Sequence, residues 1–342
     1  MTATSSSGSA LPAIAGSRVS ASSTAHPSGP DMVDAVVVTY HSRDQIGACI
    51  RALRQLRVLG RIVVVEHGGD GAGRVARSLG ATVVEDPSNP GFGAGQNRGR
   101  SLCTAPYVLL CNPDAVVDPH GLAAGLRAMA ADPTLAVCQG VVRDRRSAKP
   151  ERSGGVRLGP LHLWGRALHL RTLLRARAVH SIVARIPVVA DTAMRTTGAP
   201  RDVDVLAATA ILARRAALDA VGGFDESYFL YGEDLDLCER LRRAGWRLRS
   251  IPEHWATHQS GSSASSSWER ELYWWEGTMR YAARWYPARW WGPAVGAAAV
   301  RAATLALCRP PDAVTAYRRC LARPVRERRA WTRRAQVTTT HS

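Results

Sequence analysis

Tyr107-Val-Leu-Leu-Cys-Asn-Pro-Asp114 is the stretch of sequence that decides the fold. Its apolar residues are typical of a strand buried on both faces of a parallel sheet, and the run stops at Asn112-Pro113-Asp114. Ligands of an open parallel sheet bind beyond the carboxyl ends of its strands. We therefore expect the Asp114 carboxylate where a substrate phosphate and a divalent cation would lie. The alternative is an Asp that only serves a turn after a strand.

Further apolar runs alternate with segments of helical periodicity on both sides of this stretch. Strand–helix alternation at this spacing predicts an α/β fold with a doubly wound, mostly parallel sheet flanked by helices and joined by right-handed crossovers. The predicted strands, besides 107–111, are 34–40, 61–66, 81–85, 203–212 and 246–251, and the predicted helices are 44–56, 73–79, 96–102 and 234–244.

Outside these predicted strands and helices, the 342-residue chain contains segments of distinct composition. Residues 1–31 are rich in Ser, Ala, Gly and Pro, which predicts a disordered leader. Residues 143–203 are Arg-rich without a clean strand pattern, which favours an insertion of loops and short helices. Residues 263–325 are predicted to be a helical extension, and residues 326–342 a basic tail.

The chain has a formal net charge of +17, which indicates an anionic partner. A nucleotide sugar, an anionic membrane surface and nucleic acid all fit that charge. No zinc-finger or RRM signature is present, so nucleic acid is not expected. The seven cysteines form no Cys-x-x-Cys pair, which favours reduced thiols in a cytosolic protein. With no secretory signal and no uncharged apolar run of ~18–20 residues, a soluble or peripheral protein is predicted, at the inner face of the plasma membrane.

Residues 268–291 are unusually rich in Trp, Tyr and Arg, and a nearly apolar run, Ala294–Leu307, follows them. Aromatic rings with Arg suit a membrane–water interface, and this apolar run is too short to span a bilayer. The alternative is a buried pair of core helices followed by a solvated basic tail.

Three further groups of residues are candidates for chemistry. Glu233, Asp234 and Asp236 stand together at the start of a predicted helix, where one or two are expected to serve the helix terminus and one could act as a base. The glycine-rich segment 89–97 lies at another helix start, where free N–H groups favour anions; it is neither a dinucleotide fingerprint nor a Walker A loop. His258 would fit as a nitrogen ligand beside Asp114 if the fold brings the two together, although a lone His is more often structural.

These motifs, in this order, resemble those of the family 2 inverting glycosyltransferases with the GT-A fold. Within that family the chain looks most like the rhamnosyltransferase branch that extends cell-wall or O-antigen lipid intermediates. The resemblance covers about residues 33–262 and implies a glycosyltransferase domain over 32–262, with the 143–203 insertion on the acceptor side. The motifs that carry it are Val-Val-Val-Thr-Tyr40, Val-Val-Val-Glu66-His-Gly-Gly, Asn89-Pro-Gly-Phe-Gly-Ala-Gly-Gln-Asn-Arg-Gly, Leu-Leu-Cys-Asn-Pro-Asp114, Gly222-Gly-Phe-Asp-Glu-x-Tyr-Phe-Leu-Tyr-Gly-Glu-Asp-Leu-Asp236-Leu-Cys and His258.

The resemblance implies a role for each matching position. Asp114, the last carboxylate of the family's Asp-x-Asp motif, and His258 would hold Mg²⁺ or Mn²⁺. Asp234 would be the general base, flanked by Glu233 and Asp236. The nucleotide sugar would be held by Thr39, Tyr40, Glu66, Gly91, Phe92, Gly93, Asn97, Asn112 and Asp114.

The implied reaction moves a sugar, best matched by L-rhamnose from dTDP-rhamnose, to a glycan or lipid-linked glycan acceptor. His41, Glu66 and His67-Gly68-Gly69 replace the usual Asn, Asp and Asn-Gly-Ser, and these departures concern nucleotide recognition. The alternative function is a non-catalytic relative that binds nucleotide sugars or serves as a scaffold.

Overall fold

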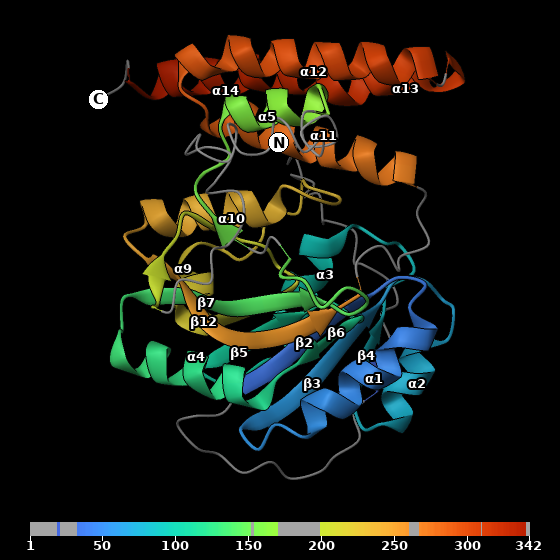
Figure 1. Cartoon of the computed structure of the whole chain (residues 1–342), viewed down its shortest axis with the longest axis vertical. Helices are drawn as coiled ribbons and strands as arrows, with labels where there is room; N and C mark the ends of the chain where they lie inside the picture. Colours follow the sequence, from blue (N-terminus) through green and yellow to red (C-terminus); the bar gives the residue numbers. More distant parts are fainter. Residues whose placement is uncertain are drawn as a thin grey trace, which may run out of the picture.

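The computed structural model describes residues 19–20, 33–151, 154–169, 199–259, 267–308 and 310–339. Most of the predicted disordered leader and residues 170–198 of the Arg-rich insertion lie outside the described residues. Within the described residues a sheet of ten strands is flanked by helices on both faces, and a layer of C-terminal helices lies beyond one face (Figure 1). The doubly wound sheet and the helical extension that the sequence predicted are thus confirmed.

The strands of this sheet lie in the order β1-β4-β3-β2-β5-β11-β7-β12-β6, with β9 paired to β12. In that order they are Val19–Ser20, Thr82–Glu85, Leu59–Glu66, Val33–Thr39, Tyr107–Cys111, Ala210–Arg214, Leu135–Asp144, Arg247–His258 and Ala115–Val117, and β9 is Arg201–Asp202. Strands β8 (Gly154–Gly155) and β10 (Val205–Leu206) form a separate antiparallel pair.

The sheet is mixed because β11 runs against both of its neighbours. Strands β4, β3, β2 and β5 are parallel to one another, as are β7 and β12. β11 pairs antiparallel with β5 and β7 and joins the two parallel halves. The carboxyl end of β5 therefore lies beside the start of β11, a position where ligands of α/β sheets bind.

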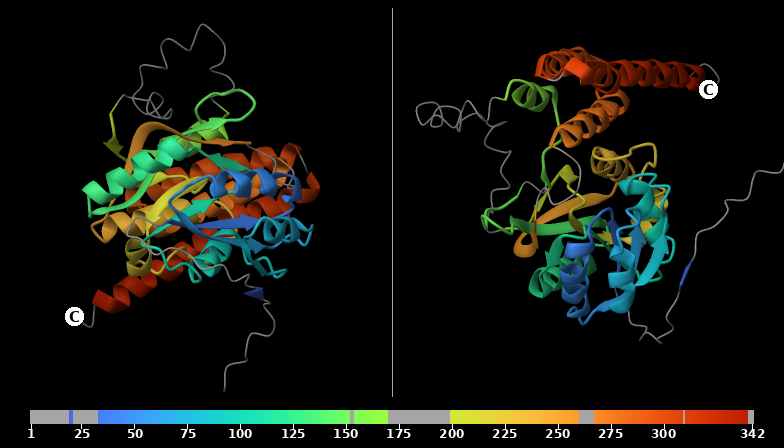
Figure 2. Two further views of the ribbon diagram at one scale, coloured as in Figure 1. Left: turned by 90° about the horizontal axis from the view of Figure 1, so that it is seen from below. Right: turned by 90° about the vertical axis from the view of Figure 1, so that its right-hand side faces the viewer.

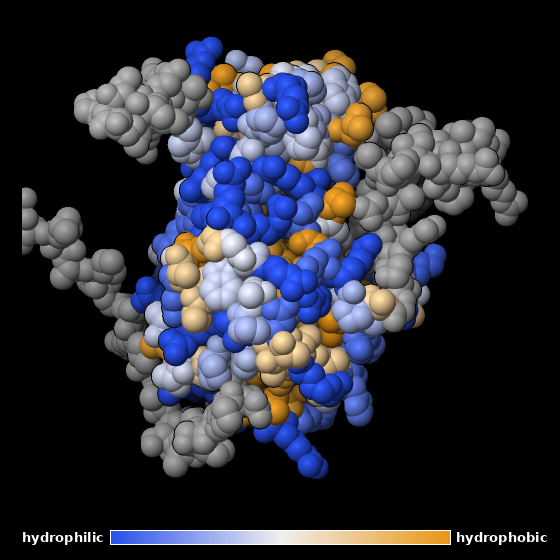
Figure 3. Space-filling view, turned by 90° about the vertical axis from the view of Figure 1, so that its left-hand side faces the viewer, coloured by the Kyte–Doolittle hydropathy of each residue, from blue (hydrophilic) through white to orange (hydrophobic). Residues whose placement is uncertain are grey.

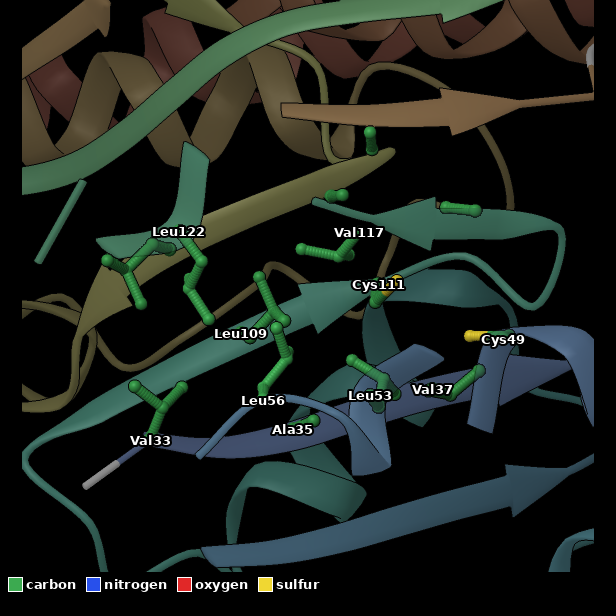
Figure 4. Close-up of a cluster of buried hydrophobic side chains, with 14 of the residues drawn as sticks. Val33, Ala35, Val37, Cys49, Leu53, Leu56, Leu109, Cys111, Val117 and Leu122 are labelled. Atoms are coloured by element: carbon green, nitrogen blue, oxygen red, sulfur yellow. The ribbon is translucent and has the colours of Figure 1, made fainter. Parts of the chain in front are cut away.

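Alternating side chains of the central strands supply two cores. Val33, Ala35 and Val37 of β2 point to one face, which is covered by α1 (Arg43–Arg54), α2 (Ala72–Ser78) and α4 (Pro119–Ala131) (Figure 4). Val36 and Val38 point to the other face, which is covered by α3 (Phe92–Arg100), α9 (Arg215–Ala220) and α10 (Glu233–Arg243). Because both faces of the sheet are buried, the sequences of its central strands are continuous apolar runs.

Local sequence explains where several helices begin and how they face the sheet. The buried face of α1 carries Ile46, Ile50 and Leu53, spaced as the helical period requires. The carboxylate of Asp118 accepts a hydrogen bond from the Gly121 N–H (2.9 Å) and caps α4, whose first residue is Pro119. α10 has three carboxylates in its first turn and three Arg residues in its last turn, which suits the helix dipole.

The C-terminal helices pack on a third core of their own, above α10 (Figures 1 and 2). Trp275 and Tyr281 are fully buried in it. Much of the aromatic-rich segment therefore forms the core of this layer, as the alternative to a membrane interface predicted. The elements are α5 (Pro160–Ala167), α11 (Ser267–Trp285), α12 (Ala288–Cys308), η1 (Pro310–Asp312), α13 (Ala313–Tyr317), η2 (Arg318–Ala322) and α14 (Arg323–Thr339), and the last includes most of the predicted basic tail.

The structure differs from the prediction on the length of the apolar segment. α12 has 21 residues and, by length and composition, meets the criteria for a membrane span, whereas the sequence predicted a run that is too short. About a third of the apolar stretch of α12 is buried inside the protein. Arg301 of α12 is buried, and its guanidinium Nε lies 3.2 Å from the Glu271 carboxylate. On the surface of this layer hydrophobic and hydrophilic residues are mixed (Figure 3, top).

Candidate active site

A cleft of about 710 Å³ opens at the carboxyl ends of β2, β3 and β5. Its walls also include the first turn of α3, the end of β12, the loop before α10 and the first turns of α11. The predicted site residues that line it are Tyr40, Gly91, Phe92, Asn112, Asp114 and His258.

Asp114 and His258 come together through the pairing of β12 with β6. His258 is the register partner of Ala115, the residue that follows Asp114. The imidazole Nε2 of His258 consequently lies 3.1 Å from the Asp114 carboxylate. The sequence predicted a shorter strand that ends at Ile251, but β12 continues to His258 with a break in its pairing between Ser250 and His254. Pro252 lies at this break and has no N–H to donate to a neighbouring strand.

Glu151 contacts the second ring nitrogen of His258 and was not among the predicted site residues. Its carboxylate accepts a hydrogen bond from His258 Nδ1 at 2.9 Å. A turn over residues 144–149 returns the chain along β7, so that the Glu151 N–H donates to the Val142 carbonyl. Burial lowers the pKa of His258, but the hydrogen bonds and charges of Asp114 and Glu151 outweigh burial and raise the pKa to about 9.

The donor atoms at this point of the cleft fit a divalent cation. Two ligand atoms bound at right angles to one ion, each about 2.1 Å from it, are about 3 Å apart. The Asp114 oxygen and His258 Nε2 have this separation. Glu151 occupies the second ring nitrogen, as carboxylates do for metal-binding His residues. No group of three or more His, Cys, Asp or Glu ligands occurs among the described residues; Asp114 and His258 would supply two ligands, and phosphate oxygens and water would complete the coordination.

Tyr40, Gly91 and Phe92 form the wall beside β2 and α3. Tyr40 is 44% exposed, so its ring is available to a flat ligand. Gly91 has φ +112°, and a Cβ there would lie 2.4 Å from the Phe229 carbonyl oxygen, so only Gly fits. His41 has φ +50°, a conformation that Asn adopts more readily than most residues.

Four residues predicted to bind the nucleotide sugar lie outside the lining of the cleft. Thr39 is fully buried in the sheet, and Gly93 packs against Phe224. The longer side chain of Glu66 reaches the start of α2, where its carboxylate accepts from the Gly71 N–H (3.2 Å). The Asn97 amide donates to and accepts from the backbone of Phe224, both at 2.9 Å, so it ties α3 to the loop before α10.

The three carboxylates at the start of α10 have different environments. Asp236 is fully buried and accepts hydrogen bonds from Arg240 (2.6 Å), Arg284 (3.1 Å) and Trp285 (2.7 Å). These hydrogen bonds give Asp236 a structural role, and its predicted place in the catalytic group stays a prediction. Its carboxylate joins α10 to α11, because a buried charge must be paired.

Glu233 and Asp234 are the two carboxylates of α10 that remain candidates. Burial, and then the charge of Asp234, raises the pKa of Glu233, and one Glu233 oxygen has no hydrogen-bond partner among the described residues. Burial also raises the pKa of Asp234, although its carboxylate accepts from the backbone N–H groups of Leu235 (2.8 Å) and Ala208. Asp234 does not line the cleft, but Thr209, next to Ala208, does.

The cleft also has a wall that the sequence analysis did not assign to the site. Phe229 and Tyr231 come from the loop before α10, and Glu269, Arg270 and Tyr273 come from α11. The Phe229–Tyr231 segment lay within a quoted motif, but nothing in the sequence of α11 showed that this helix returns to the cleft.

The profile of a known protein family, Glycosyltransferase like family 2, matches residues 30–288. The chain belongs to this family. The match covers the sheet except β1, the cleft with Asp114 and His258, and helices α5 and α11 of the C-terminal layer.

Three relatives of known activity are similar to parts of the chain. An N-acetylglucosaminyl-diphospho-decaprenol L-rhamnosyltransferase of Mycobacterium tuberculosis is 28% identical over 199 residues, which are 52% of this chain and 60% of that protein. A pre-mycofactocin glycosyltransferase of the same species is 31% identical over 66% of this chain and 43% of its own length. The rhamnosyltransferase WbbL of Escherichia coli is 41% identical over 86 residues, 24% of this chain and 31% of WbbL. The aligned part of this chain thus spans less than two thirds of each relative.

Proposed function

We propose that this chain is an inverting glycosyltransferase that uses a nucleotide-diphosphate sugar. The observation that carries the proposal is the pair formed by Asp114 and His258 at 3.1 Å on the floor of the cleft. The two residues are far apart in the sequence and meet at the carboxyl end of β5, where a donor diphosphate would lie. Two of the relatives described above are rhamnosyltransferases, which supports L-rhamnose from dTDP-rhamnose as the donor.

In this proposal Asp114 and His258 hold Mg²⁺ or Mn²⁺, and Glu151 fixes the orientation of the imidazole. When bound, such an ion neutralises the charge that develops on a departing diphosphate. Tyr40 and the α3 terminus at Gly91 and Phe92 flank the nucleotide, and the positive end of the α3 dipole favours an anion.

The acceptor hydroxyl attacks the anomeric carbon from the face opposite the diphosphate. A new carbon–oxygen bond forms while the bond to the diphosphate breaks, so the configuration at the anomeric carbon inverts. Asp234 takes the hydroxyl proton, and its raised pKa makes it a better base near neutral pH than an ordinary Asp. The nucleoside diphosphate leaves as the anion.

The variant Asp234→Asn tests this assignment because Asn is similar in shape but cannot accept the proton as a base. General-base catalysis contributes about 10²–10⁴-fold, so turnover should fall by that factor. The affinity for the donor, measured by calorimetry with Mn²⁺, should stay within about twofold of wild type. An Asn variant with near-normal turnover would remove Asp234 from the role of base.

The acceptor in this proposal is a glycan or a polyprenyl-diphosphate-linked glycan, reached from the inner membrane surface. Large apolar side chains are exposed on the C-terminal layer: Leu307 (84%), Val314 (60%) and Tyr317 (58%), with Arg318 adjacent. Exposed apolar residues beside cationic residues suit an anionic lipid surface. Flotation with anionic liposomes tests this contact. Leu307→Asp should weaken binding, and no binding of wild type at low salt would refute the membrane contact.

A non-catalytic relative that only binds nucleotide sugars is the second candidate. Replacement of the usual Asn, Asp and Asn-Gly-Ser by His41, Glu66 and His67-Gly68-Gly69 favours altered nucleotide recognition, and Glu66 is bound to α2. Measurement of donor hydrolysis separates the two candidates, because a binding protein would show a donor-induced rise in melting temperature without release of nucleoside diphosphate.

A further inference from the structure

The lining of the cleft contains a pair of aromatic rings from two different elements. Phe229 belongs to the loop before α10 and Tyr273 to α11, and their ring centroids are 5.0 Å apart at an interplanar angle of 36°. Both line the cleft, and Phe229 is 39% exposed. Two aromatic rings that stand together on the wall of a cleft indicate a surface for a ligand with an apolar face.

The pair is held in place before any ligand arrives. The guanidinium of Arg319 lies 4.8 Å from the centre of the Tyr273 ring. The carbonyl of Phe229 accepts from the Phe92 N–H at 2.9 Å, and Gly91 makes that close approach possible. Because the rings are already ordered, a ligand that stacks on them loses little free energy to ordering.

The loop that carries Phe229 is also fixed against α11. Tyr231 has φ +65°, an uncommon conformation for a Tyr residue. The following Gly232 lies so close to Gly277 that a Cβ on Gly232 would be 2.6 Å from the Gly277 carbonyl oxygen. Backbone strain of this kind persists where the surrounding structure enforces it, often at binding sites.

The chemistry of this wall matches a sugar ring. A pyranose offers an apolar face of C–H groups and a rim of hydroxyl groups. The ring pair provides an apolar surface, and Glu269 and Arg270 of the same wall provide groups that hydrogen-bond hydroxyls. A lipid chain without a sugar has no hydroxyl groups with which Glu269 and Arg270 could hydrogen-bond. Most of the predicted nucleotide-binding residues that line the cleft belong to other elements, at the ends of β2 and β5 and the start of α3.

We propose that Phe229 and Tyr273 form the acceptor subsite, on which the sugar ring that carries the attacked hydroxyl stacks. This inference rests on the proposed function and names where the acceptor binds. Truncation of an aromatic anchor in a binding site commonly costs tenfold or more in affinity. Phe229→Ala should therefore lower the ratio of transfer to donor hydrolysis by about tenfold, mainly through a higher KM for the acceptor.

The experiment measures two rates in one sample that contains the nucleotide sugar and Mn²⁺. One is transfer to a short-chain lipid carrying N-acetylglucosaminyl diphosphate, and the other is transfer to water. Phe229→Tyr keeps the ring and should keep the ratio. Arg127→Ala, which truncates an exposed side chain of α4 that does not line the cleft, is the control and should change neither rate. A ratio in Phe229→Ala equal to that of wild type would overturn the proposal, as would an equal loss of both rates.

A binding measurement separates failure of the subsite from failure of the proposed function. Saturation-transfer NMR with N-acetylglucosaminyl diphosphate reports contact with the protein without turnover. Loss of its signal in Phe229→Ala, with the signal kept in Arg127→Ala, supports the subsite; an equal signal in Phe229→Ala and wild type overturns it. A wild-type protein that neither transfers nor hydrolyses any donor contradicts the proposed function, and the NMR result still decides on the subsite.

Discussion

Replacement of Glu151 by Gln tests whether the contact between Glu151 and His258 supports a metal site. The Glu151 carboxylate lies 2.9 Å from His258 Nδ1, while Nε2 faces Asp114 at 3.1 Å. A carboxylate in this position fixes the ring and makes the other nitrogen a better ligand. Loss of such a partner typically reduces metal affinity by 10- to 100-fold, which corresponds to about 1.4–2.7 kcal/mol.

The assay is a titration with Mn²⁺ in which the free ion is measured by electron paramagnetic resonance. Glu151→Gln should raise the Kd for Mn²⁺ by at least tenfold, and activity at limiting Mn²⁺ should recover when more Mn²⁺ is added. Glu253→Gln is the control, because Glu253 is an exposed carboxylate on the same strand as His258. Equal Mn²⁺ affinities in the two variants would refute the reasoning that Glu151 orients a metal ligand.

Three further variants test the packing around the cleft. Asp236→Asn should lower the free energy of unfolding by about 3–5 kcal/mol in urea titrations, because it leaves Arg240 and Arg284 without their buried partner; a loss below 1 kcal/mol would contradict the role of Asp236 as an anchor. In Glu233 the folded pKa is raised from 4.5 to about 8, so the wild type should lose stability as pH rises through this window. Glu233→Gln should abolish that loss. The midpoint of urea unfolding is measured at pH 5 and at pH 9; if it changes by the same amount in Glu233→Gln and in wild type, the loss does not come from the Glu233 carboxyl. Gly91→Ala should destabilise the protein and weaken donor binding, whereas Gly245→Ala, at φ +88° with open space around the added Cβ, should show only the backbone strain of ~1–3 kcal/mol; equal losses would exclude the clash with Phe229.

The N-terminal half of the fold could be predicted from the sequence because its strands are buried on both faces. The predicted strands 34–40, 61–66 and 107–111 agree with β2, β3 and β5 to within two residues. The reversed direction of β11 could not be predicted, because an apolar run contains no information on strand direction. The continuation of β12 beyond Pro252 to His258 was missed for a local reason, since Pro usually interrupts a strand.

The candidate site could be predicted only where a short motif carries the signal. Asp114 and His258 were expected together, and the register of β12 against β6 brings them into contact. Glu151 lies 107 residues before His258 in a segment without a clear pattern, so only the tertiary structure reveals their contact. Asp236 could not be separated from Glu233 and Asp234 by sequence, because its partners Arg284 and Trp285 belong to a helix about 50 residues later.

The most direct test of the proposed function is release of nucleoside diphosphate from a panel of nucleotide sugars, dTDP-rhamnose included, in the presence of Mn²⁺. Wild type should release the diphosphate from at least one donor, and both chelation of the ion and the change Asp114→Asn should abolish the release. Equal release by wild type and Asp114→Asn, or no release from any donor, would contradict the assignment of this cleft to glycosyl transfer.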